Sequence, residues 1–187
     1  MRDSEMDTVC YQNLMSRTDR PGETATLALA GVIAGVWQRE VPRVGADSLA
    51  RLFRRYFPGV KVESAIPCRY DALACHVFRV DEYDDLVELL LEHRSRADED
   101  GEWLAHAIAA ACMDDNHLWQ DMGLPDRADL SALLHEHFRT LFDKNTANMK
   151  WKKFFYKQLC ARAEINICKA PSCAVCIDHK VCFGPEQ

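Results

Sequence analysis

The stretch SLARLFRRYF, residues 48–57, indicates the fold class of this 187-residue chain. Its apolar side chains are Leu49, Leu52, Phe53, Tyr56 and Phe57. They recur at intervals of three or four residues, and charged residues lie between them. This spacing is typical of one buried face of an amphipathic helix, whereas a half-buried strand would alternate at every second residue. Asp47 can cap the helix at its start, and Pro58-Gly59 ends it.

The same pattern recurs on both sides of this stretch. Helices are predicted over residues 24–39, 81–94, 103–112, 126–141 and 146–160, with Asp126 as a cap. Gly31 and Gly35 are four residues apart and mark a small-residue face where another helix can approach. The mixed pattern of residues 60–80 predicts a segment that connects two helices and contains at most one short helix. No strong strand pair is present, so the sequence predicts an all-α protein.

We expect three parts along the chain. Residues 1–20 are polar without a clear period and predict a loosely held leader. Residues 21–160 form the helical domain, which is long enough for one real core because 48% of the chain is hydrophobic. Residues 161–187 form an irregular, cysteine-rich, cluster-binding tail.

The composition argues against several classes of function. A net charge of −6 argues against general nucleic-acid binding, which needs a basic face. The most apolar early run, residues 27–37, is shorter than the ~20 residues that cross a bilayer. It follows a charged leader, unlike a signal peptide, so we expect a cytoplasmic protein. Nothing resembles a phosphate-binding glycine loop or a Ser/His/Asp set, and nothing resembles a coiled coil, so we expect a monomer.

The C-terminal cysteines carry the strongest chemical signal. The chain has nine cysteines, an odd number, and in a reducing compartment clustered thiols are more often metal ligands than disulfides. Four of them have the spacing C-x4-C-x2-C-x5-C: Cys168, Cys173, Cys176 and Cys182. Four soft thiolates separated by short loops can wrap a soft metal or an iron–sulfur cluster. We therefore place the functional site in this motif.

The spacing leaves two kinds of site open. A zinc site with four cysteine ligands usually pairs two short C-x2–4-C units, whereas this motif resembles the C-x4-C-x2-C part of cluster proteins. His179 lies inside the motif and is a candidate additional ligand, followed by His117. Cys160 could also face the metal. Cys112 lies on an apolar helical face and is interpreted as a core residue.

Longer stretches of the chain are similar to a known family. They are NHLWQDMGL at 116–124, DLSALL at 129–134, MKWKKFFYKQLC at 149–160, the cysteine motif itself and CFGPE at 182–186. In these residues the chain resembles the NifQ family of nitrogen-fixation proteins. The likeness is dense from about residue 114 onward and thinner before it, and the cysteine spacing matches the family pattern without departure.

The resemblance implies an iron–sulfur protein, with 4Fe–4S as the expected class, that binds molybdenum. Its members supply molybdenum in a Mo–Fe–S form to assembly of the nitrogenase iron–molybdenum cofactor, and act as donors rather than enzymes. The expected recipients are the cofactor scaffold complex and the nitrogenase iron protein. Cys168, Cys173, Cys176 and Cys182 carry over as cluster ligands. The alternatives are a structural zinc knot on a helical interaction module and an iron–sulfur redox protein.

A lysine stripe precedes the motif. Lys150, Lys153 and Lys157 fall at i, i+3 and i+7, so on a helix they share one face. The stripe has two interpretations: an ordinary solvated face, or a basic surface that attracts molybdate or guides an acidic recipient. An adjoining face of this helix is apolar and is predicted to pack on the body of the protein: Trp151, Phe154, Phe155 and Leu159.

Overall fold

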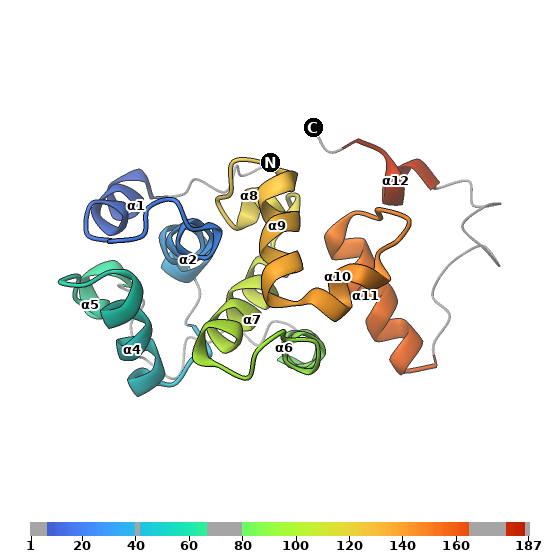
Figure 1. The fold of residues 1–187 in the computed structure, drawn as a ribbon, viewed down its shortest axis with the longest axis horizontal. Helices are drawn as coiled ribbons and strands as arrows, with labels where there is room; N and C mark the ends of the chain where they lie inside the picture. Colours follow the sequence, from blue (N-terminus) through green and yellow to red (C-terminus); the bar gives the residue numbers. More distant parts are fainter. Residues whose placement is uncertain (1–6, 40–41, 67–79, 165–178, 186–187) are drawn as a thin grey trace.

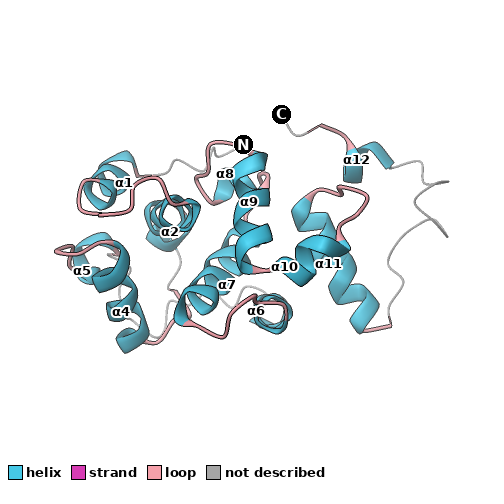
Figure 2. Ribbon diagram, in the orientation of Figure 1, coloured by secondary structure: helices cyan, strands magenta, loops and turns pink. Residues whose placement is uncertain are grey.

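The structure is a computed structural model that describes residues 7–39, 42–66, 80–164 and 179–185. Over these ranges it contains helices and no strand, which confirms the predicted all-α class (Figures 1 and 2). None of the described helices is long and apolar enough to span a membrane. The helices are α1 (Thr8–Met15), α2 (Thr24–Ala34), α3 (Val36–Arg39), α4 (Ala46–Tyr56), α5 (Val62–Ala65), α6 (Val80–Glu92), α7 (Glu99–Cys112), α8 (Leu118–Asp121), α9 (Arg127–His137), α10 (Arg139–Lys144), α11 (Trp151–Arg162) and α12 (His179–Phe183).

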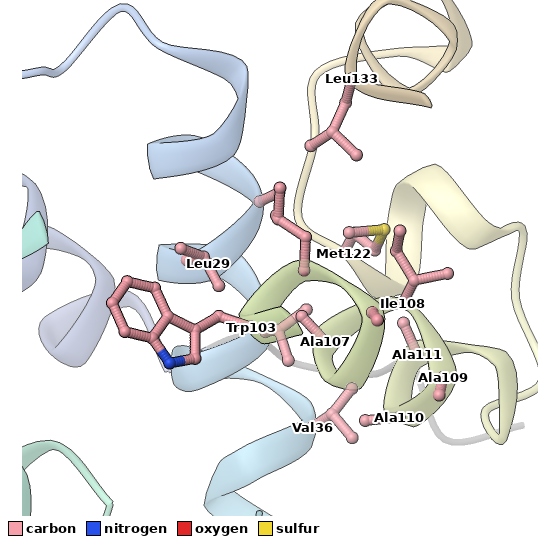
Figure 3. Packing of buried hydrophobic residues seen from close by; sticks show 14 of the residues in the cluster. Leu29, Val36, Trp103, Ala107, Ile108, Ala109, Ala110, Ala111, Met122 and Leu133 are labelled. Atoms are coloured by element: carbon pink, nitrogen blue, oxygen red, sulfur yellow. The ribbon is translucent and has the colours of Figure 1, made fainter. Parts of the chain in front are cut away.

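Helix α7 lies at the centre of the core. It is rich in alanine, and its side chains from Trp103 to Cys112 are buried apart from the half-buried His106. Figure 3 shows three side chains arranged around this helix: Leu29 of α2, Met122 in the turn after α8, and Leu133 of α9. Small side chains let these neighbours approach closely, so the core is packed without needing long side chains on α7 itself.

Gly31 permits the closest approach in the core. A Cβ atom added there would lie 2.2 Å from the carbonyl oxygen of Met122 and 2.8 Å from the Cα atom of Gly123. The predicted small-residue face at this position is therefore confirmed. The neighbour is the turn after α8 rather than another helix, which was not expected from the sequence.

Two of the predicted helices are broken. The helix expected over residues 24–39 is interrupted at Gly35, which has φ −112° and ψ −91°. The helix expected over 126–141 is interrupted at Phe138, whose ring is fully buried. The N–H of the following residue, Arg139, donates to the Ser95 side chain at 3.1 Å instead of continuing the helical ladder. A tertiary contact therefore accompanies the break at Phe138, whereas the break at Gly35 is seen in the backbone angles of that glycine.

Two helix starts also differ from the expectation. Helix α4 begins after Gly45, and Asp47 lies in its first turn without a side-chain capping bond. Helix α11 begins at Trp151 rather than near residue 146, because the Asn145 side chain holds both main-chain groups of Met149, at 2.8 and 2.9 Å. By contrast, Asp126 caps α9 as predicted, accepting from the N–H of Asp129 at 3.0 Å.

Helix α1 corrects the expectation that residues 1–20 are loosely held. Asp7 caps it through two main-chain N–H groups, at 3.0 Å each. Leu14 is fully buried, and the Asp7 N–H donates to the carbonyl of Ala34 at 2.7 Å. Because one buried leucine anchors this helix, the sequence shows no periodic stripe. The short helix expected within residues 60–80 is α5, and residues 67–79 lie outside the described part.

Candidate functional site

A cavity of about 710 Å³ lies next to the C-terminal helix α12. Its wall is built from Glu82 on α6, residues 112–118 between α7 and α8, Gln120, residues 150–153 at the start of α11, Tyr156, and Val181 on α12. This volume falls within the ~300–1,000 Å³ typical of ligand pockets. The wall is mainly polar, because it carries three lysines, three carboxylates and His117.

The aromatic face of α11 fixes how the helix presents its lysines. Trp151, Phe154 and Phe155 are buried, which confirms the predicted packed face, and Leu159 is partly buried. The Trp151 indole stacks on Phe142 with ring centroids 5.7 Å apart, and its N–H donates to Ser131 Oγ at 3.3 Å. With this face packed, Lys150, Lys152 and Lys153 are left on the cavity wall.

Lys152 makes a buried ion pair that the sequence did not reveal. Its Nζ lies 2.5 Å from Oδ2 of Asp121, and the two side chains are 16% and 0% exposed. It also donates to the carbonyl of Asp114 at 2.7 Å, while Asn116 Nδ2 donates to Asp121 Oδ1 at 3.0 Å. Burial raises the pKa of Asp121 despite the opposing effect of Lys152. No sequence pattern pairs two positions 31 residues apart.

The other charges of the wall are not equally paired. Asp114 is bound by the Arg39 guanidinium and is therefore compensated. Lys150 and Lys153 have no carboxylate within ion-pair distance among the described residues. The predicted lysine stripe is thus divided, because Lys150 and Lys153 line the cavity and Lys157 is exposed beyond it.

The last cysteine of the motif lies beside this wall. Cys182 is half-buried and packs at the edge of the core, and its carbonyl accepts a hydrogen bond from the N–H of Lys150 at 2.8 Å. The preceding residue, Val181, lines the cavity. Cys168, Cys173 and Cys176 lie outside the described residues, so their position relative to Cys182 stays a prediction.

The other candidate ligands lie in different places. His117 lines the cavity at the start of α8, and its N–H donates to Gln120 Oε1 at 3.1 Å. His179 is exposed and stacks on Phe183, with ring centroids 4.4 Å apart. Cys160 lies in the last turns of α11, about 15 Å along the helix from Lys150. Because the main chain of Cys182 is bonded to Lys150, Cys160 lies toward the opposite end of α11 from Cys182.

Cys112 lies at the inner end of α7, where the cavity meets the core. It is 4% exposed, which confirms its interpretation as a core residue. Burial raises the pKa of its thiol to about 12, and the nearby Lys152 only partly offsets this. Since metals bind the thiolate, a thiol that stays protonated at neutral pH is poorly suited as a ligand.

Over the described ranges, no three His, Cys, Asp or Glu side chains gather closely enough to hold a metal ion. This is expected of the described part alone, because it contains one of the four predicted ligands. Over the described residues, the fold and the cavity define a helical protein with a charged pocket beside Cys182, the last cysteine of the C-terminal motif.

Comparison with known sequences identifies the family. A sequence profile of the NifQ family matches residues 22–184. Protein NifQ of Azotobacter vinelandii is 40% identical over 74% of this chain and 75% of its own length. The NifQ homologue of Sinorhizobium fredii is 35% identical over 83% of this chain and 72% of its own length. Protein NifQ of Rhodobacter capsulatus is 35% identical over 76% of this chain and 74% of its own length. The chain belongs to the NifQ family, which confirms the resemblance, and no solved structure matches it.

Proposed function

We propose that this chain is a cytoplasmic nitrogen-fixation protein that binds molybdenum on an iron–sulfur cluster and donates it to assembly of the nitrogenase iron–molybdenum cofactor. Its recipients are the cofactor scaffold complex and the nitrogenase iron protein. The chain acts as a carrier, so each round ends when the metal leaves. The observation that carries the proposal is the position of Cys182, the last motif cysteine, against the cavity wall at Lys150.

The residues present fit such a group. A set of four cysteine thiolates suits iron–sulfur clusters, and Cys182 is half-buried rather than sealed in the core. Cys168, Cys173, Cys176 and Cys182 would hold the cluster, which supplies sulfur ligands for molybdenum when bound. Cysteine thiols release their protons when they bind a metal, so loading of the cluster depends on pH.

The described residues have supporting roles. The hydrogen bond from Lys150 holds the main chain of Cys182 at the start of α11, and the Lys152–Asp121 ion pair holds that start against α8. The ammonium groups of Lys150 and Lys153, which have no ion pair among the described residues, would add positive charge beside Cys182. A cation near an anionic site stabilises it most where the local dielectric is low.

Anaerobic purification followed by metal and sulfide analysis tests the proposal. The wild-type chain is expected to contain iron and sulfide and to acquire molybdenum at the cluster. Substituting alanine for Cys168, Cys173, Cys176 or Cys182 is expected to remove most of the bound iron and molybdenum. A colourless protein that contains zinc and no sulfide would instead identify a structural zinc knot.

Cys112→Ala is the matched control, because it removes one thiol without touching the motif. We expect its iron and sulfide content to equal that of the wild type, with a stability loss of roughly 1 kcal/mol from the small core cavity. Full iron and sulfide in the Cys173→Ala variant would disprove the assignment of the ligands. Iron and sulfide without molybdenum uptake would indicate a redox protein.

A further inference from the structure

The cavity wall contributed by α11 differs in charge from the other walls. Lys150, Lys152 and Lys153 all belong to α11, whereas the lining carboxylates Glu82 and Asp115 belong to α6 and to the α7–α8 connection. Positive charge is therefore gathered on one side of the cavity. The cavity as a whole is not positive, so any anion it takes must lie against α11.

Two of these lysines are available to a ligand. Lys152 is committed to Asp121 and to the carbonyl of Asp114. Asp114 is in turn neutralised by Arg39, so it does not compensate Lys150 or Lys153. Within the described chain, neither of these two lysines has an ion pair. Unpaired neighbouring ammonium groups on a recessed wall repel each other, and an anion between them relieves that repulsion.

Main-chain donors reinforce the same side. The N–H groups of residues 151–153 have no hydrogen-bond acceptor among the described residues, and the side chain of Lys150 provides no cap. Helices α1, α7 and α9 instead have an aspartate that accepts from these first N–H groups. Residues 151–153 are among those that line the cavity, and N–H groups at the start of a helix favour an anion.

We propose that the α11 wall of this cavity binds a tetrahedral oxyanion between Lys150 and Lys153, next to Cys182. Lysine suits such an ion because its ammonium group is a compact charge with several donors. The identification of the natural anion as molybdate rests on the proposed function, since molybdate is the oxyanion that such a carrier must receive. The wall would hold the anion beside the cysteine motif before any thiolate is bound to it.

Equilibrium dialysis of the full-length chain, freed of metal by chelation, against molybdate tests this inference. We expect one molybdate per chain, with an affinity that falls as salt is added because partly exposed charges are screened. Tungstate, which has the same shape and charge, should displace it. The variant Lys150→Gln/Lys153→Gln should bind at least about tenfold more weakly. Lys157→Gln alone should have a smaller effect, because Lys157 does not line the cavity.

The matched control is Lys61→Gln/Lys144→Gln, which removes the same charge from two exposed lysines away from the cavity. It should bind molybdate as the wild type does. The inference would be overturned if the Lys150→Gln/Lys153→Gln variant bound molybdate as tightly as the wild type. It would also be overturned if the control variant lost as much affinity as that variant, or if tungstate did not displace molybdate. Its failure is distinct from failure of the proposed function, because iron and sulfide loading is measured separately and needs the cysteines rather than these lysines.

Discussion

The main chain of Lys150 is held from two directions: its N–H donates to the carbonyl of Cys182 at 2.8 Å, and its carbonyl accepts from Phe154 at 2.9 Å. One residue therefore links the first turn of α11 to α12, which contains the last motif cysteine. This link brings together two segments that lie on either side of Cys168, Cys173 and Cys176 in the sequence. It places the start of α11 against Cys182.

Removing metal should leave the helical body folded. Among the described residues the buried core contains no motif cysteine, and Cys182 and Phe183 only pack against its edge. Far-ultraviolet circular dichroism of the protein with and without a chelator is expected to differ little. Loss of most of the helical signal would show that the fold depends on metal, as in zinc fingers.

Breaking the Lys152–Asp121 pair should destabilise the protein strongly. Lys152→Met would leave a carboxylate with no exposed surface and no cation, a cost of about 3–5 kcal/mol in the free energy of unfolding. The double variant Lys152→Met/Asp121→Asn should recover much of this, because no unpaired charge remains. Urea unfolding of the two single variants and the double variant measures the coupling.

Lys61→Met is the control for that cycle, because it removes a lysine that is exposed. Its free energy of unfolding should stay within about 0.5 kcal/mol of the wild-type value. A loss for Lys152→Met no larger than for Lys61→Met would mean that the ion pair contributes little.

Gly31→Ala should test the close approach of α2 to the turn after α8. The new methyl group would lie 2.2 Å from the Met122 carbonyl oxygen, so main chain must move, at a cost of about 1–3 kcal/mol. Gly22→Ala is the matched control, because nothing lies within 4 Å of its added Cβ atom. A thermal unfolding midpoint of Gly31→Ala equal to that of Gly22→Ala would contradict the packing described here.

His106 should make stability depend on pH. Burial lowers the pKa of His106 below its usual 6.5, and Nδ1 is 2.8 Å from the Tyr83 hydroxyl. The unfolded chain therefore binds the proton more readily, so the contribution of His106 is complete above pH 6.5 and is lost as the pH falls through the lowered pKa. His106→Gln keeps a hydrogen-bond acceptor but does not titrate.

Urea unfolding of both proteins at several pH values between 7.5 and 5 measures this effect. The wild type should lose more stability than His106→Gln as the pH falls. The difference between them isolates His106, because His93 and His137, whose pKa values burial also lowers, are present in both. Parallel curves for the two proteins would show that His106 does not carry the dependence.

The sequence predicted the parts of the fold that depend on local periodicity. The stripe from Leu49 to Phe57, the cap at Asp126 and the packed face of α11 are all found, because each needs only neighbouring residues. The break at Phe138 was missed because the contact of Ser95 with Arg139 joins positions 44 residues apart. The break at Gly35 was also missed, because the sequence pattern continues through that residue.

The candidate site shows the same division. The sequence placed Lys150, Lys153 and Lys157 on one helical face, but did not show which of them reach a cavity, because that depends on how α11 docks. It overlooked Lys152, whose partner Asp121 lies on another helix. The four-cysteine assignment depends on spacing and family membership, and it stays a prediction.

The way α12 is attached bears on how the carrier proposed above would release its metal. This helix has five residues, none of them buried, and Val181 is 54% exposed. Segments with so few buried contacts detach in local opening events that need far less free energy than global unfolding. The lifetime of the loaded state would then be set by how often α12 separates from α11, so a recipient that captures the detached helix could speed the handover without disturbing the domain.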